Sequence, residues 1–301
     1  MNRIRIVADS SCDLITLDEV SFVSVPLTIR TETQEFRDDA SLDVETMVDT
    51  LRSTKGRSYS ACPSVADWER AFGEDDDVLA FTITSGLSGS FRAACAAKLN
   101  CEENSPSRRI CIIDSLSTGP EIVLLIEKAV SELSAGADFD AVCRSVQDYQ
   151  RRTHLIFALE SLHNLAQNGR VGKLAAAAAG MLGIRAVGTT SDEGTLDLLG
   201  KCRGRKRAVD FLQEEMERLG YTGGCVRIGH CRNTDSAGEL RTAILHRFPG
   251  ANIRIYPLRG LCSYYAECGG VLVEKSLLKR PLLSCIMEPQ KILRIKHSKD
   301  Y

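Results

Sequence analysis

Two short runs in the first half of the chain, VLAFTI at residues 78–83 and ICIID at residues 110–114, are apolar without alternation. A strand with one wet face alternates apolar and polar residues, so these runs indicate a parallel sheet that is covered on both faces. Helical patterns lie between the strands, and this order predicts right-handed crossovers and a doubly wound domain. Strands are expected at residues 3–8, 22–28, 78–83 and 109–113. Helices are expected at residues 41–51, 64–72, 88–99 and 121–151, the last as one helix or two.

The pattern of strands and helices restarts near residue 154, which predicts a second domain. Strands are expected there at residues 155–158, 185–189, 195–199, 224–228, 253–257 and 270–273, and helices at residues 159–167, 173–182, 205–219 and 236–246. The short turns between these segments favour a mixed sheet. We therefore expect a two-domain α/β protein. It has an N-terminal parallel-sheet α/β/α domain at residues 1–154 and a C-terminal mixed-sheet α/β domain at residues 155–301.

The 301 residues carry a formal net charge of −2, and 44% of them are apolar. This composition is that of a globular protein and argues against a nucleic-acid-binding domain, which is usually strongly basic. The first residues have no signal-peptide pattern, and no apolar run reaches the roughly 18 residues that a membrane helix needs. The 12 cysteines form no C-x-x-C pair and no zinc-site spacing. We therefore expect free thiols, a cytoplasmic location and no metal.

Hydroxyl and glycine residues gather where three of the expected parallel strands end. The segments are Asp9-Ser10-Ser11, TSGLSGS at residues 84–90 and DSLSTG at residues 114–119. Ligands of open parallel sheets bind at the carboxyl ends of the strands, so all three segments are expected on one rim. In the middle segment the glycines allow close backbone approach, and a helix that opens at Ser88 directs free N–H groups at an anion. The ordinary alternative is a tight turn with a helix cap, which any α/β protein uses.

Three further segments carry candidate residues. Ser60 lies in SACPS (residues 60–64), just ahead of a helix, and its ordinary place is a capping loop. Asn168-Gly169-Arg170 follows another helix, and its ordinary role is a C-cap with a solvated arginine. Arg170 is alternatively a permanent positive charge for a carboxylate. The basic segment KCRGRKRA at residues 201–208 is ordinarily a solvated surface.

Five segments together resemble the motifs of the DegV family, in the family's order. They are SYSACPS at residues 58–64, ITSGLSGSF at 83–91, IDSLSTG at 113–119, LESLHNLAQNGRVGK at 159–173 and KCRGRKRA at 201–208. The resemblance extends from residue 4 to about residue 273. It implies two α/β domains that hold a fatty acid between them. It also implies that the chain presents the acyl carboxylate to a bacterial fatty-acid kinase subunit, which makes the acyl phosphate.

The resemblance also assigns roles to residues by motif. The carboxylate is expected to contact Ser60, Ser88 and Arg170, with Tyr265 at a fourth position. Supporting contacts are assigned to the rim loops, at Ser10, Ser85, Gly86, Gly89, Ser90 and Ser115. The acyl tunnel is assigned to apolar residues that also suit a plain core, namely Leu159, Leu162, Leu165, Leu174, Met181 and Leu182. Docking of the kinase is assigned to Arg203, Arg205 and Arg207.

Two segments depart from the family pattern. Family members usually carry a histidine in a stretch resembling H-T-G-P-G, where this chain has Tyr265, and Glu267 replaces a glycine. A phenol still donates a hydrogen bond but is neutral at pH 7. Glu267 is expected to add negative charge beside the carboxylate, which is unfavourable without a partner. Ser60-Ala61-Cys62-Pro63 keeps one of the two hydroxyls of the family's TSQP. Fatty-acid binding is expected to tolerate these changes better than phosphorylation does.

We therefore predict a non-catalytic, monomeric carrier of a long-chain fatty acid. It is expected to have no cofactor, no metal, no nucleic-acid partner and at most transient contact with a membrane. The departures leave open a carrier of a different anionic lipid or small ligand. A serine-dependent acyl hydrolase is a third reading, although residues 86–90 lack the final glycine of G-x-S-x-G and all five histidines lie in the second half of the chain.

Overall fold

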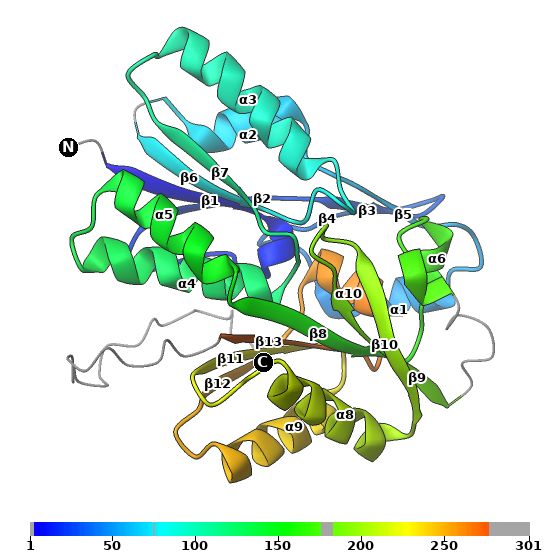
Figure 1. Ribbon diagram of the computed structural model, residues 1–301. Helices are drawn as coiled ribbons and strands as arrows, with labels where there is room; N and C mark the ends of the chain where they lie inside the picture. Colours follow the sequence, from blue (N-terminus) through cyan, green and yellow to red (C-terminus); the bar gives the residue numbers. More distant parts are fainter. Residues whose placement is uncertain (1–2, 75, 176–182, 277–301) are drawn as a thin grey trace.

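The computed structural model describes residues 3–74, 76–175 and 183–276 (Figure 1). Its first sheet, sheet A, has four parallel strands in the order β2-β1-β6-β7. The strands are β1 (Ile4–Asp9), β2 (Ser21–Val25), β6 (Asp77–Thr82) and β7 (Ile110–Asp114). Every residue of the central strand β6 is buried. The parallel sheet that the continuous apolar runs predict is confirmed.

Helices cover both faces of sheet A. One face packs against α2 (Val65–Phe72) and α3 (Ser90–Asn104). The other face packs against α4 (Pro120–Ser134) and α5 (Phe139–Gln150). The long helical stretch is thus two helices, and they are separated at Gly136, whose φ of 82° is a conformation that glycine adopts without steric cost.

The second sheet, sheet C, has six strands in the order β10-β9-β8-β13-β11-β12. The strands are β8 (Thr153–Leu159), β9 (Ile184–Thr190), β10 (Leu196–Arg203), β11 (Cys225–His230), β12 (Asn252–Pro257) and β13 (Val271–Ser276). The pair β11 and β12 is parallel, and the other pairs are antiparallel. The mixed sheet predicted for the second half is therefore confirmed.

The two sheets and their helices stack in five layers (Figure 1). From top to bottom in Figure 1 these are α2 with α3, sheet A, α4 with α5, sheet C, and α8 (Arg205–Arg218) with α9 (Thr234–Arg247). Helix α4 contacts strands of both sheets. One hydrophobic cluster runs through this middle layer and contains Phe81 of sheet A, Ile126 of α4 and Phe157 of sheet C. The inner face of sheet C therefore shares a core with sheet A.

A third, small sheet lies beside this stack and has no counterpart in the sequence-based expectations. Sheet B is antiparallel, in the order β4-β3-β5. Its strands are β3 (Thr28–Arg30), β4 (Glu35–Arg37) and β5 (Tyr59–Ala61). Three short helices accompany it, namely α1 (Val44–Ser53), α6 (His163–Gln167) and α10 (Gly260–Ala266). The single strand expected at residues 22–28 covers β2 except for its first residue and reaches the first residue of β3.

Several predicted helix starts were wrong. Helix α3 begins at Ser90, because the Ser88 hydroxyl accepts the N–H of Ser90 from outside the helix. Helix α1 begins at Val44, with the Asp43 side chain as its N-cap. The helix expected from Leu159 begins at residue 163, because Leu159 is the last residue of β8. Of the alanine-rich helix expected at 173–182, residues 176–182 lie outside the described residues.

The strands of sheet A end by residue 114, and those of sheet C begin at residue 153. The division into domains at residues 154 and 155 stays a prediction, since one core cluster joins both sheets. Among the described helices, none has the length and apolar character needed to cross a bilayer.

Candidate functional site

The three loops that follow β1, β6 and β7 meet at one edge of sheet A, as predicted. The fully buried Asp9 holds these loops together. Sequence reasoning did not identify it as a functional candidate. Its carboxylate accepts hydrogen bonds from the Ile83 N–H at 2.9 Å and the Ser90 hydroxyl at 2.6 Å. It also accepts the backbone N–H and hydroxyl of Ser11. Burial raises the pKa of Asp9, and these four donors act against that rise.

The buried serines of the rim hold the loops together and do not line the cavity described below. Ser10 accepts the N–H of Leu27 at 3.0 Å. Ser90 donates to Asp9, and Ser115 donates to the carbonyl of Ser117 at 2.9 Å. These three hydroxyls therefore act on a ligand only through the loop geometry that they maintain.

The glycines of the middle loop have different neighbours. At Gly86, a Cβ atom would lie 2.8 Å from the carbonyl oxygen of Glu193, in the turn between β9 and β10, so glycine permits this contact between the loop and sheet C. Gly86 does not line the cavity described below, and its contact with a ligand stays a prediction. Gly89 does line the cavity. The N–H of Ser85 donates to the Asp114 carboxylate at 3.0 Å, which joins the loops after β6 and β7.

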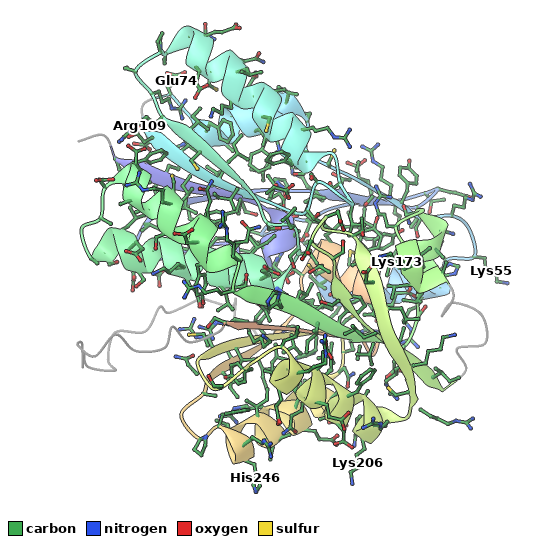
Figure 2. All side chains as sticks on the ribbon, viewed as in Figure 1. Lys55, Glu74, Arg109, Lys173, Lys206 and His246 are labelled. Carbon is green, nitrogen blue, oxygen red and sulfur yellow. The ribbon has the colours of Figure 1, made fainter. Side chains whose placement is uncertain are left out.

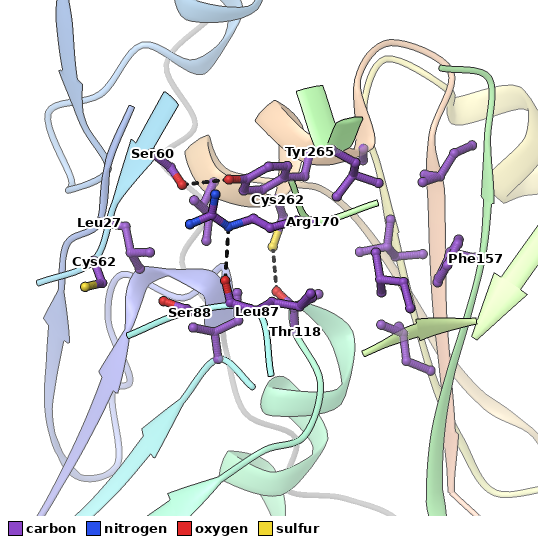
Figure 3. Close-up of a pocket in the computed structure, with 18 of the residues that line it drawn as sticks. Leu27, Ser60, Cys62, Leu87, Ser88, Thr118, Phe157, Arg170, Cys262 and Tyr265 are labelled. Carbon is purple, nitrogen blue, oxygen red and sulfur yellow. Dashed lines mark hydrogen bonds between the residues drawn. The ribbon is translucent and has the colours of Figure 1, made fainter. Parts of the chain in front are cut away.

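A cavity of about 300 Å³ opens between the rim loops, sheet B, α10 and the inner face of sheet C (Figure 3). This volume lies at the lower end of the range for ligand pockets, about 300–1,000 Å³. All four residues predicted to bind the carboxylate line it, namely Ser60, Ser88, Arg170 and Tyr265. They lie together at one end, and most of the remaining lining is aliphatic or aromatic. The cavity therefore has one polar end and an apolar body.

At the polar end, two hydroxyls form a pair. The Ser60 Oγ and the Tyr265 OH are 2.7 Å apart (Figure 3). One hydroxyl donates to the other, so the pair keeps one hydrogen for a ligand. Burial raises the pKa of Tyr265, so the phenol stays neutral and remains a donor. Ser88 accepts the N–H of Ser90 and makes no donor bond to the described residues, so its hydrogen is also free.

Arg170 turns into the cavity from the turn after α6, where the N–H of Arg170 bonds to the carbonyl of Leu165. Its Nε donates to the carbonyl of Leu87 at 3.0 Å, and its Nη1 donates to the carbonyl of Asn168 at 2.9 Å. Its guanidinium also lies 5.9 Å from the centre of the Tyr265 ring. Carbonyls carry no net charge, and no carboxylate among the described residues pairs with Arg170. The cavity thus holds a positive charge without a counter-ion.

A second network behind the polar end positions α10. The Tyr264 and Tyr265 rings meet edge to face, with centroids 4.7 Å apart. The Tyr264 OH accepts from the Asn168 side chain at 2.8 Å and lies 2.9 Å from the Ser58 hydroxyl. Since Asn168 also offers its carbonyl to Arg170, the tyrosines and the arginine are braced through one residue.

Two buried carboxylates hold the other end of α10. Asp38 accepts the N–H groups of Gly260 and Leu261 at 3.0 and 2.8 Å, and Asp13 accepts the N–H of Arg259 at 2.8 Å. Acids at a helix N-terminus satisfy unpaired donors there and interact favourably with the helix dipole. Burial nevertheless raises the pKa of Asp13 to about 8. Sequence reasoning missed both residues, because they are over 200 positions from the helix that they cap.

The expectation that Glu267 places its charge beside the ligand was wrong. Glu267 does not line the cavity; its carboxylate accepts the N–H of Asn164 at 3.0 Å and the Ser161 hydroxyl at 2.8 Å. It has a φ of 53°, which explains why glycine suits this position in other family members. The acid therefore caps the start of α6 and does not oppose an anion at Arg170.

The six residues predicted to line an acyl tunnel lie in different places, and their role stays a prediction. Leu159 and Leu165 line the cavity. Leu162 and Leu174 are buried in the core but do not line it. Met181 and Leu182 lie outside the described residues. The sequence reasoning missed apolar lining residues from sheet C, from the loop after β6 and from α10, namely Leu155, Phe157, Leu196, Leu272, Ile83 and Leu261.

The basic segment lies at the junction of β10 and α8, away from the cavity, and Lys206 points outward there (Figure 2). Arg205 pairs with Asp235 at 2.7 Å, and Arg207 pairs with Glu214 at 2.8 Å. Arg203 is exposed. Two of the three arginines predicted to dock a kinase are therefore already paired with acids, and the docking role stays a prediction.

A family model described as "Uncharacterised protein, DegV family" matches residues 3–275. Among curated proteins, a DegV domain-containing protein of Streptococcus pneumoniae is 43% identical over 273 residues, which covers 89% of this chain and 97% of that protein. A DegV domain-containing protein of Streptococcus pyogenes is 41% identical over 273 residues and covers 89% of this chain and 98% of its own length.

Two solved structures are also similar. One is a DegV family protein from Eubacterium eligens loaded with heptadecanoic acid, with a TM-score of 0.88 and 42% identity over 91% of this chain and 100% of that one. The other is the Fatty Acid Kinase (Fak) B3 protein of Streptococcus pneumoniae loaded with linoleic acid, with a TM-score of 0.88 and 42% identity over 91% of this chain and 99% of that one. The family match spans nearly all the described residues, and the chain therefore belongs to the DegV family.

Proposed function

We propose that this protein binds a long-chain fatty acid in the cavity and holds its carboxylate at the polar end. The observation that carries the proposal is the positive charge of Arg170, which has no acid partner among the described residues and faces an apolar cavity. A buried or half-buried charge is costly unless it is paired, so the site favours an anionic ligand. A fatty acid supplies both the anion and the apolar chain.

The geometry suggests how each group contributes. Arg170 uses Nε and Nη1 to fix its own position, and its Nη2 makes no hydrogen bond to the described residues, which leaves it for a carboxylate oxygen. The free hydroxyl hydrogens of Ser88 and of the Ser60–Tyr265 pair supply two more donors. A carboxylate accepts all three, since each of its oxygens has two lone pairs. The acyl chain then extends from this end toward sheet C.

We further propose that the protein presents the carboxylate to a fatty-acid kinase subunit and has no catalytic step of its own. The kinship with Fak B3 at 42% identity supports this role. The ionised carboxylate is itself the nucleophile, so the partner's part is to bring the phosphoryl donor to the polar end. We also propose that the protein is a cytoplasmic monomer that contacts membranes transiently. The described cysteines form no disulfide, which is consistent with a reducing compartment.

The other two functions have weaker support. A different anionic ligand is favoured only by Tyr265, which is neutral where family members usually carry a histidine. A serine hydrolase needs a base beside its nucleophile, and no histidine lines the described cavity around Ser88. Both remain outcomes of the test below.

The test compares ligands that differ only at the head group. Calorimetric titration with a long-chain fatty acid, its methyl ester and its alcohol should give clear binding of the acid alone, because the ester and alcohol carry no charge for Arg170. Equal binding of the three compounds would contradict a carboxylate site. Release of free acid from the ester would instead support a hydrolase. A coupled assay with a fatty-acid kinase subunit then measures acyl-phosphate formation, and a fatty acid that is bound but never phosphorylated would contradict the kinase role.

A further inference from the structure

The inner face of strand β8 forms the wall of the cavity that lies across from the polar end. Leu155, Phe157 and Leu159 occupy alternate positions, so their side chains project from the same face, and all three line the cavity. Figure 3 shows Phe157 on the side away from Ser60 and Ser88. An acyl chain whose carboxylate sits at the polar end therefore runs toward this strand.

Phe157 packs against a glycine of the neighbouring strand in sheet C. Its cross-strand neighbours are Leu272 in β13 and Gly188 in β9. A Cβ atom built on Gly188 would lie 2.5 Å from Cζ of the Phe157 ring and 2.6 Å from Cε2. The ring thus packs directly against the backbone of β9, where Gly188 has no side chain. Only 3% of Phe157 is exposed, so the ring is also packed from above.

We infer that Phe157, which packs against Gly188, determines which acyl chain length the protein prefers. This inference rests on the proposed function and adds a specificity residue to it. Phe157 is the only phenylalanine among the described residues that line the cavity, and it projects from a strand that is hydrogen-bonded on both sides. A chain that ends before the ring leaves apolar surface uncovered, while a longer one must displace a side chain that is held by close packing.

The expected effect is large enough to measure. Each methylene that is newly buried strengthens binding by about four-fold, the equivalent of about 0.8 kcal/mol. Phe157→Leu and Phe157→Ala remove part or all of the ring, so the preferred chain should lengthen, and more for alanine. Gly188→Ala adds a Cβ atom 2.5 Å from the Phe157 ring and 2.6 Å from the backbone carbonyl oxygen of Asp197 in β10, so the ring must move and the pairing of β9 with β10 is strained. A folded Gly188→Ala protein should therefore have a changed preferred chain length.

The experiment measures dissociation constants of even-numbered saturated fatty acids, from short to long, for wild type and the variants. Phe81→Leu is the matched control, since Phe81 is fully buried in the same core cluster but does not line the cavity. It should lower the melting temperature and leave the preferred length unchanged. A thermal unfolding curve for each variant checks that it is folded. If Gly188→Ala does not fold, the Phe157 variants alone test whether Phe157 sets the preferred chain length.

The outcomes separate the two levels of the argument. If wild type binds none of the acids, the proposed function fails. If wild type binds them and the folded Phe157 variants keep its preferred length, the inference is overturned while the proposed function stands. A shift that Phe81→Leu produces equally would also overturn it, because the effect would then be a general loosening of the core.

Discussion

Replacement of Arg170 by alanine removes the charge on which the proposed site depends. In the structure, Nε and Nη1 of Arg170 are committed to the carbonyls of Leu87 and Asn168, so the part available to a ligand is Nη2 and the net charge. A hydrogen bond to a charged group contributes about 1.5–3 kcal/mol. At about 1.36 kcal/mol per factor of ten, Arg170→Ala should weaken fatty-acid binding by about 10- to 150-fold.

The assay is calorimetric titration of the delipidated protein with a fatty acid. Arg170→Lys keeps the charge but loses the two-carbonyl anchorage of the planar guanidinium, so its affinity should fall between those of wild type and Arg170→Ala. Arg185→Ala is the control, because Arg185 is paired with Glu160 and does not line the cavity; its affinity should match wild type. An Arg170→Ala protein that is folded and binds within two-fold of wild type would refute the reasoning.

Three further results are expected. Ser60→Ala and Tyr265→Phe should each weaken fatty-acid binding by about 2- to 10-fold. The double variant should weaken binding by less than the product of the two single effects, because either change already breaks the hydrogen bond that the two residues share. A titration series in which the two effects multiply would contradict this. Asp9→Ala should lower the free energy of unfolding by about 2–6 kcal/mol in urea, since the Ile83 N–H and the Ser90 hydroxyl lose their acceptor at about 1–3 kcal/mol each. Because Asp13 has a pKa of about 8 in the fold and an ordinary value of 3.8, it binds its proton more tightly when folded, so its contribution to stability declines as pH rises from about 4 to about 8. Asp13→Asn should therefore show a flatter pH dependence of unfolding than wild type, and parallel curves would exclude Asp13 as the cause.

The parts of the fold that follow from local sequence were predictable. The apolar runs of β6 and β7 identify a covered parallel sheet, and the Ser/Gly segments after β1, β6 and β7 do meet at one edge. Sheet B was not predictable, because each of its three strands has only three residues, too few for a period to be visible. The start of α3 was misplaced by two residues because a serine outside the helix accepts its first N–H.

The four residues that the sequence predicted to bind the carboxylate all line one cavity in the structure. Their role there stays a prediction. The wall was less predictable. The alternation Leu155, Phe157 and Leu159 in β8 was a signal that could have identified the lining, but the helix expected from Leu159 concealed it. Asp9, Asp38 and Glu267 act through contacts with N–H groups that are distant in the sequence, and no local pattern reports such contacts.

Native mass spectrometry of the freshly purified protein, followed by denaturing extraction of the bound molecule, shows whether the cavity holds a fatty acid. We expect a stoichiometric fatty acid that dissociates on unfolding and that binds again when the emptied protein is incubated with palmitate or oleate. A protein that is purified empty and stays empty after incubation with both acids would contradict the claim, and the cavity around Arg170 would then hold a different anion.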